Sequence, residues 1–128
     1  MKHLQDATVL TLGLGTTGLA MARWCARHGA AVRVWDSRAQ APQAQALAAH
    51  VPSALRVQGE LDASSLDGVS LVLKSPGLSP LDEPVASLLS AAKQRRVLVQ
   101  GELDLFACAL AEMKVAQAYD PKVLAITG

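Results

Sequence analysis

The six residues 13–18, with the sequence GLGTTG, constrain the fold of this chain more than any other feature. They overlap the end of a run of apolar and β-branched residues (8–14) and the start of a stretch (16–28) in which small residues recur at helical spacing. Glycines between a buried strand and a helix allow a tight turn, a close helix and the approach of a phosphate to the backbone. The first N–H groups of such a helix have no partner within it and face a bound anion. The hexapeptide therefore predicts a strand–turn–helix unit with an anion site at its turn.

Apolar runs and helical stretches alternate along the rest of the chain. We expect strands at residues 8–14, 31–35, 55–57, 69–73, 97–99 and 123–126, helices at 16–28, 85–95 and 102–114, a helical turn at 61–67, and a weak helix or a loop at 39–50. The strands are continuously apolar, which indicates burial on both faces. The expected fold class is α/β, with a Rossmann-like, mostly parallel sheet and helices on both of its faces.

The helix expected at 102–114 is amphipathic. Leu103, Phe106, Ala107 and Leu110 form its predicted apolar face. Acidic residues in its first turn favour the positive end of the helix dipole.

Composition excludes several classes of function. Twelve Lys and Arg residues nearly balance eleven Asp and Glu residues, which argues against a nucleic-acid-binding surface. No apolar run reaches the roughly 20 residues of a membrane span, and the N-terminus lacks a signal sequence. Cys25 and Cys108 lie far apart without a metal-ligand pattern, so small buried thiols are expected. No nucleophile–base pair is evident, and we predict a cytoplasmic protein with no catalytic residue and no metal site in this stretch.

An acidic residue, Asp36, ends the second expected strand, and Ser37 and Arg38 follow it. In dinucleotide-binding folds an acid roughly 20 residues beyond the glycines contacts the ribose of NAD. A carboxylate beside an exposed strand-end N–H is also complementary to the N3–H and O4 edge of uracil. Both interpretations suit the residues.

A proline–glycine turn, Ser75-Pro76-Gly77, follows the fourth expected strand. It lies at the carboxyl edge of the sheet, where open α/β sheets bind their ligands. A glycine there would let a flat ring lie against bare backbone, although the same sequence also suits an ordinary turn.

Five motifs in this order, LGLGTTGLA, VWDSR, LKSPGLSP, GELDLF and VLAITG, together resemble the Mur ligases, and most closely the branch of that family that adds D-glutamate. The resemblance covers essentially the whole chain. It implies a UDP-binding Rossmann-like domain at residues 1–96 and a truncated start of the central ATP-binding domain at residues 97–128. Thr127 and Gly128 would begin a phosphate loop whose lysine is missing.

The resemblance also implies the activity of a full-length parent. That enzyme would use ATP and Mg²⁺ to form an acyl phosphate on UDP-N-acetylmuramoyl-L-alanine, which D-glutamate then attacks to give the amide, ADP and phosphate. It would serve peptidoglycan synthesis as a cytoplasmic monomer. For this stretch alone we expect no cofactor, no ATP hydrolysis and no ligation.

By resemblance, nine residues form the UDP contacts: Gly15, Thr16, Thr17, Asp36, Ser37, Arg38, Ser75, Pro76 and Gly77. The threonines would contact the diphosphate, and Asp36 with Ser37 the edge of uracil. Arg38 would lie over the ring and the backbone of Gly77 against its other face. Lys74 departs from the usual family pattern and would add a phosphate contact.

Three other interpretations remain open: the same domain of another Mur ligase, an NAD(P)-binding domain of a dehydrogenase, and a non-catalytic nucleotide-sensing module. The apolar tail at 123–126 is expected to pack on a second copy, so that the fragment self-associates.

Overall fold

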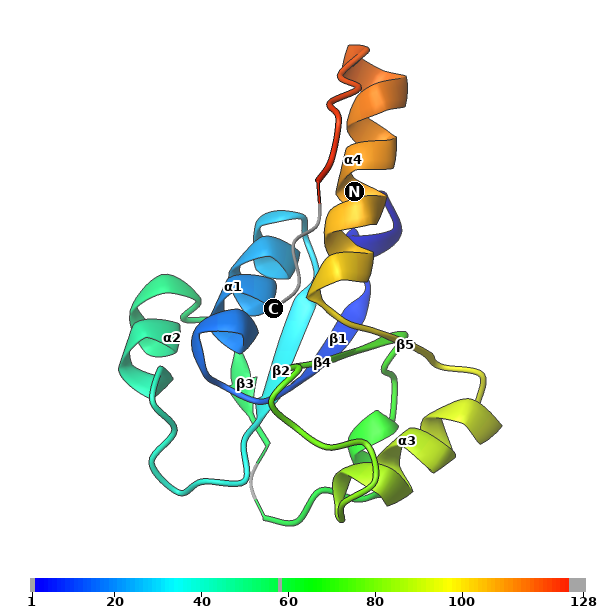
Figure 1. The fold of residues 1–128 in the computed structure, drawn as a ribbon. Helices are drawn as coiled ribbons and strands as arrows, with labels where there is room; N and C mark the ends of the chain where they lie inside the picture. The colour runs from blue at the N-terminus through cyan, green and yellow to red at the C-terminus, as the bar shows by residue number, and fades with distance from the viewer. Residues whose placement is uncertain (1, 58, 125–128) are drawn as a thin grey trace.

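The computed structural model describes residues 2–57 and 59–124, and in them a five-stranded sheet whose strand pairs are all parallel. The strands are β1 (Thr8–Leu12), β2 (Ala31–Trp35), β3 (Leu55–Arg56), β4 (Leu71–Lys74) and β5 (Leu98–Gln100). Their order in the sheet is β3-β2-β1-β4-β5, so the chain winds outward from the central β1 in both directions (Figure 1). The expected fold class is confirmed.

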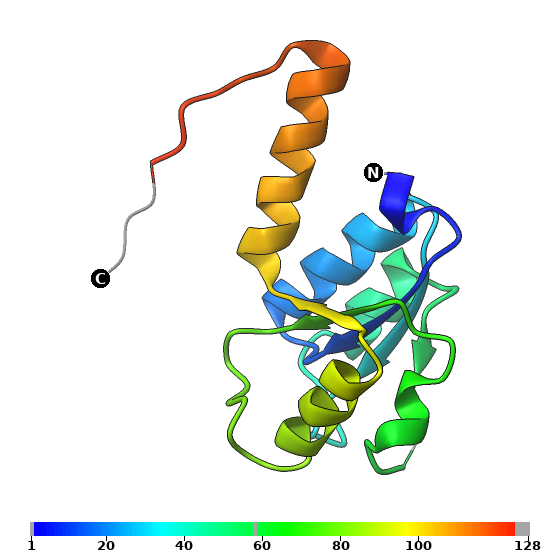
Figure 2. The same ribbon diagram turned by 90° about the vertical axis from the view of Figure 1, so that its right-hand side faces the viewer.

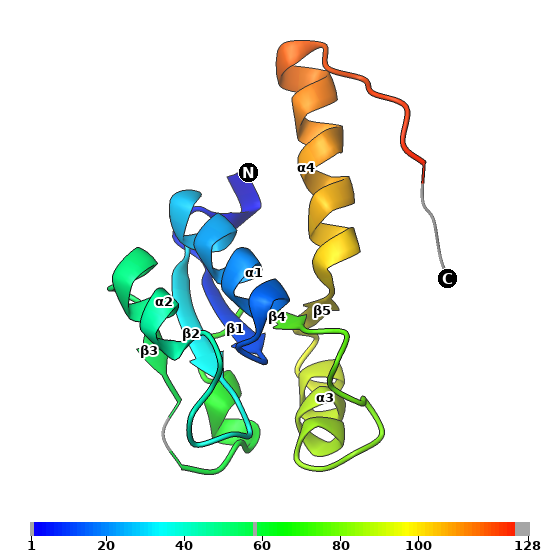
Figure 3. The same ribbon diagram turned by 60° about the vertical axis from the view of Figure 1, so that its left-hand side comes forward.

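Helices cover both faces of the sheet. They are α1 (Thr16–Arg27), α2 (Ala44–His50), α3 (Val85–Gln94) and α4 (Glu102–Gln117), with short 3₁₀ helices η1 (Lys2–Leu4) and η2 (Ala63–Leu66). The helices α1 and α2 lie on one face, and α3 and η2 lie on the other (Figure 3). Successive residues of β1 serve the two faces, because Val9 packs with α1 and α2 while Leu10 packs with α3. Burial on both faces explains why the strands are continuously apolar.

The turn between β1 and α1 brings two backbone segments unusually close together. Gly13 has a φ of +99°, which side-chain-bearing residues rarely adopt. A Cβ placed on Gly18 would lie 2.0 Å from the carbonyl oxygen of Gly13. Beyond Gly18, α1 buries Met21, Ala22 and Cys25 against the sheet. The helix can lie this close to the turn because Gly18 has no side chain.

The apolar face predicted for α4 is wrong. Leu103 is 80% exposed and Phe106 is 50% exposed, whereas Leu105 and Ala109 are buried. The helix rises beyond the sheet and meets the rest of the protein beside α1 (Figure 2). Burial in α4 is therefore decided by which side faces α1, and Leu103 and Phe106 remain largely exposed.

The end of the sheet lies beyond the expected boundary at residue 96. Leu98–Gln100, assigned from the sequence to the following unit, pairs with β4 as the fifth strand. The strand expected at 123–126 is not seen at Val123 and Leu124, which have no regular secondary structure. Residues 125 and 126, as well as Thr127 and Gly128, lie outside the described residues.

Replacing Gly18 with alanine should destabilise the fold by about 1–3 kcal/mol or more, because the new Cβ would overlap a backbone oxygen that no rotamer change can move away. Urea unfolding of Gly18→Ala measures the loss. Gly77→Ala is the matched control, since nothing lies within 4 Å of its Cβ position and its effect should stay within about 0.5 kcal/mol. Equal stability of the two variants would contradict the close approach at Gly18.

Candidate functional site

A pocket of about 320 Å³ lies at the carboxyl edge of the sheet. It is lined by Gly13, Gly15, Thr16, Thr17, Asp36, Ser37, Arg38, Ser75, Pro76, Gly77 and Leu78. All nine residues that were expected to contact UDP are among them, although they come from three separate parts of the sequence. Gly13, which belongs to the hexapeptide expected to bind an anion, also lines the pocket, as does Leu78, which was not predicted to do so.

The parallel order of the sheet explains why these residues meet. The strands β2, β1 and β4 are neighbours and run in the same direction, so the loops that follow them lie side by side. The loop after β1 carries the glycines, the loop after β2 begins at Asp36, and the loop after β4 begins at Ser75.

Asp36 connects the loop after β2 to the glycine loop. Its Oδ2 accepts a hydrogen bond from the backbone N–H of Leu14 at 2.8 Å. The guanidinium of Arg38 donates to both carboxylate oxygens, through Nε at 2.9 Å and Nη2 at 2.8 Å, and the backbone N–H of Arg38 donates to Oδ1 at 2.8 Å. The Asp36 side chain is only 3% exposed, whereas that of Arg38 is 55% exposed. The predicted acceptor is therefore fully occupied within the protein, which the sequence did not indicate.

The surroundings of Asp36 keep it ionised. Hydrogen bonds from the Arg38 guanidinium are the main reason that the pKa of Asp36 lies well below its usual range, and the backbone N–H groups of Arg38 and Leu14 lower it further. The lowering exceeds the opposing effect of burial. A permanent negative charge therefore stands at the edge of the pocket, neutralised by Arg38.

The hydroxyl of Ser75 faces the glycine loop. Its oxygen would be 2.8 Å from a Cβ on Gly13 and 3.4 Å from one on Gly18. This oxygen is buried and has no hydrogen-bond partner among the residues that the structure describes. The backbone N–H of Ser75 donates to the carbonyl of Leu12 at 3.0 Å, which continues the pairing of β4 with β1. Ser75 thus packs the loop after β4 against the glycine loop after β1.

The first turn of α1 points its N–H groups towards the pocket end of the helix. Gly15 is the N-cap residue and provides no side-chain cap, and nothing lies within 4 Å of its Cβ position. Thr16 is exposed and Thr17 half-buried in that turn. Uncapped N–H groups, two hydroxyls and open space favour an anion at this point.

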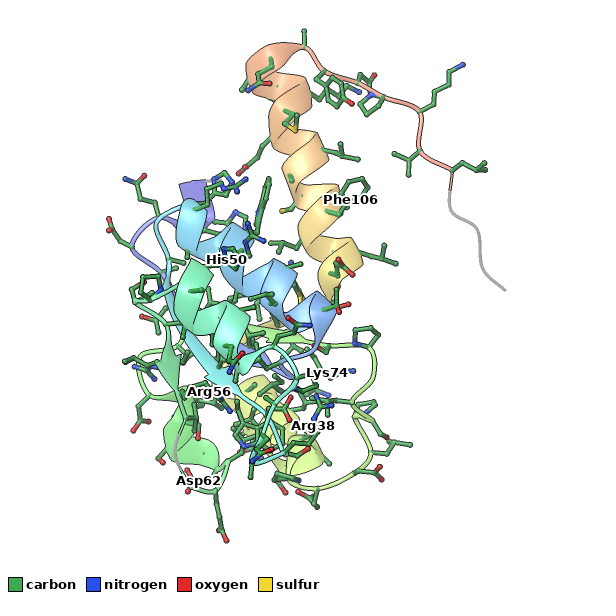
Figure 4. All side chains as sticks on the ribbon, turned by 90° about the vertical axis from the view of Figure 1, so that its left-hand side faces the viewer. Arg38, His50, Arg56, Asp62, Lys74 and Phe106 are labelled. Carbon is green, nitrogen blue, oxygen red and sulfur yellow. The ribbon has the colours of Figure 1, made fainter. Side chains whose placement is uncertain are left out.

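Lys74, the last residue of β4, is engaged with its own loop. Its Nζ donates to the carbonyl oxygen of Ser75 at 3.0 Å and to that of Leu78 at 2.7 Å. Lys74 and Arg38 lie at the same edge of the molecule (Figure 4). Its two carbonyl partners were not foreseen, although a lysine directly before a Pro-Gly turn is placed to reach the carbonyls of that turn.

Other parts of the described chain offer less chemistry. No group of three or more His, Cys, Asp or Glu residues in the described ranges is arranged to hold a metal ion. Cys25 is buried as expected, and burial raises the pKa of its thiol to about 12, while Cys108 is only partly buried. Within residues 2–57 and 59–124, none of the helices has both the length and the hydropathy to cross a membrane.

Comparison with known proteins points to the same family as the five motifs of the sequence. The family model described as "Mur ligase MurD-like, N-terminal domain" matches residues 7–101. The UDP-N-acetylmuramoylalanine–D-glutamate ligase of Ralstonia nicotianae is 60% identical over 125 residues, which are 98% of this chain and 25% of that protein. The ligase of the same name from Albidiferax ferrireducens is 53% identical over 130 residues, which cover 100% of this chain and 25% of that protein. The chain spans about a quarter of the length of these relatives.

Solved structures share the fold at low sequence identity. A pseudomurein peptide ligase type C from Methanothermus fervidus superposes with a TM-score of 0.65 at 18% identity, over 80% of this chain and 20% of that one. The shikimate dehydrogenase of Aquifex aeolicus superposes with a TM-score of 0.57 at 20% identity, over 92% of this chain and 51% of that one. Ligases and dehydrogenases thus share this architecture, and the fold alone does not separate them.

Asp36→Asn should lower stability at pH 7 by about 1–3 kcal/mol, the scale of hydrogen bonds to a charged group. A carboxyl group whose pKa is lower in the folded than in the unfolded chain stabilises the fold above the unfolded value, about 3.9, and less as the pH falls below it. Thermal melts of both proteins from pH 7 to pH 2.5 should show a constant difference down to about pH 5 and a shrinking one below about pH 4. The other carboxylates titrate in both proteins, so a difference that does not depend on pH would contradict the lowered pKa.

Proposed function

The chain belongs to the Mur ligase family, as a MurD-like N-terminal domain, and from that premise we propose that it holds the UDP part of UDP-N-acetylmuramoyl-L-alanine. The observation that supports this most directly is the pocket itself. It combines the uncapped end of α1, bare glycine backbone and an ionised carboxylate within one cavity. These are groups suited to a diphosphate, a flat ring and the polar edge of a base.

The diphosphate would bind at the start of α1. Gly15 leaves open space for a phosphate against the backbone, and Thr16 and Thr17 can donate their hydroxyls. The helix dipole contributes about 0.3–1 kcal/mol to such binding, and each hydrogen bond to a charged phosphate roughly 1.5–3 kcal/mol.

The uracil would bind between Arg38 and Gly77. Asp36 would accept a hydrogen bond from the N3–H of the base in place of one that Arg38 now donates. The backbone N–H of Ser37, beside the carboxylate, would donate to O4 of the base. The exposed guanidinium of Arg38 is then free to lie over the ring. Gly77 has no side chain, so the opposite face of the ring can rest on its backbone.

For the full-length parent we propose the activity that its relatives' name states, ligation of D-glutamate to UDP-N-acetylmuramoylalanine. ATP and Mg²⁺ would act in other parts of the parent, of whose relatives this chain spans about a quarter. The parent is proposed to be a cytoplasmic monomer. The UDP-binding unit would extend through β5 to Gln100, because β5 completes the sheet and the family match ends at residue 101.

This chain alone should bind UDP with a Kd on the order of 0.1–1 mM, because contacts from the rest of the parent are missing. NMR titration with UDP should move the amide signals of residues 13–18 and of Ser75, Gly77 and Leu78. NADH added in parallel should show no fluorescence enhancement. A folded protein that ignores several millimolar UDP would refute the proposal, and tight NADH binding would favour the dehydrogenase alternative.

UDP should bind more tightly than CDP by about 1–3 kcal/mol, the scale of a two-point contact with a base edge. An ionised Asp36 only accepts hydrogen bonds, so it attracts the N3–H of uracil and repels the N3 lone pair of cytosine. Asp36→Asn should remove most of this preference, because the amide can also donate. Competition titrations with both nucleotides measure it, and equal affinities in the unmodified protein would exclude Asp36 from base recognition.

A further inference from the structure

We propose that Lys74 is a positioning residue that holds the turn of residues 75–78 in the shape that forms one wall of the pocket. It acts through the turn rather than as a ligand of phosphate. The proposal rests on the proposed function for the identity of the bound nucleotide, but its geometric basis does not depend on it.

The ammonium group of Lys74 connects the two ends of this turn. The carbonyl oxygens of Ser75 and Leu78 lie 3.0 and 2.7 Å from Nζ. The carbonyl of Ser75 also accepts the backbone N–H of Leu78 at 3.2 Å. Three hydrogen bonds thus close a ring through the first and last residues of the turn, and two of them come from one side chain.

The middle of the turn depends on its ends. Pro76 has no backbone N–H to donate, and Gly77 has no side chain through which to pack. Both residues are exposed and both line the pocket. Their position is therefore set largely by the residues on either side, where the ammonium group binds.

Lys74 is well placed for this role because it belongs to the sheet. It is the last residue of β4 and is in register with Leu12 of β1. Its side chain is part-buried where it meets the two carbonyls. The rigid strand thus supplies a fixed point from which the charged end of the side chain reaches the turn.

The two possible roles of Lys74 predict different ligand dependence. A phosphate ligand strengthens binding of UDP but not of uridine, and its contribution falls steeply with salt. A residue that positions the turn acts on the wall that faces the base, so its removal weakens uridine and UDP by the same factor at any salt concentration. Comparing the two ligands therefore separates the roles.

The test uses Lys74→Met, which keeps much of the side-chain volume but donates nothing, and Lys93→Met, which removes the same charge from an exposed site on α3. NMR titrations with uridine and UDP are run at low and high salt. We expect Lys74→Met to weaken both ligands equally and by about 10-fold or more, the lower end of the loss of a charge-assisted hydrogen bond. Lys93→Met should bind like the unmodified protein. A loss confined to UDP and abolished by salt would overturn the proposal.

Amide hydrogen exchange in the ligand-free protein gives a second measurement. The N–H of Leu78 should exchange about tenfold faster in Lys74→Met, while strand amides of β1 remain unchanged. Unchanged exchange at Leu78 would overturn the proposal even if the variant bound ligand poorly. If the unmodified protein binds neither uridine nor UDP, the proposed function fails, and the exchange of Leu78 still decides the role of Lys74.

The unmodified protein also tests the idea without any variant. In the ligand-free state the ammonium protons of Lys74 should exchange slowly with solvent, so that the ¹⁵N signal of this group is observable. It should move by the same small amount with uridine and with UDP. A shift seen with UDP alone, on saturation of the site, would identify a phosphate contact and overturn the positioning role.

Discussion

The rest of the site depends on the contact between α1 and the turn that precedes it. With no Cβ on Gly18, the helix starts almost on top of the carbonyl of Gly13, and this sets where its free N–H groups point. The same closeness leaves a narrow space beside the glycines, which the hydroxyl of Ser75 fills. A side chain at Gly13 would therefore collide with Ser75, and one at Gly18 with the backbone of Gly13.

Many polar side chains at the pocket hold the surrounding loops together through hydrogen bonds that form without any ligand. Asp36 binds the backbone of the glycine loop and the guanidinium of Arg38, and Lys74 binds the carbonyls of its own turn. Such preorganisation reduces the ordering that binding would otherwise require. It also means that a ligand must exchange existing hydrogen bonds at Asp36, whereas at the start of α1 it meets groups without a side-chain cap.

Apolar periodicity was sufficient to predict the order of elements, and the parallel carboxyl edge to bring the glycine loop and the Ser-Pro-Gly turn together, whereas the set of nine contact residues came from the family resemblance. It was not sufficient where partners are chosen in three dimensions. Helical spacing favoured Leu103 and Phe106 as the apolar face of α4, but the buried residues of this helix are Leu105 and Ala109. One of the hydrogen bonds to the Asp36 carboxylate comes from the backbone N–H of Leu14, 22 residues earlier in the chain. The resemblance placed a boundary at residue 96, but the chain turns there, with a φ of +57° at Arg96, and adds β5 to the sheet.

The two outer strands are very short, with two residues in β3 and three in β5. Each therefore presents few unpaired backbone groups at the rim of the sheet, although Leu98 and Val99 of β5 are partly exposed. A foreign strand would find almost no template for extending the sheet, which is how many α/β proteins avoid fibrous aggregation. The apolar central strands are thus flanked on both sides by borders too short to act as extended templates for another strand.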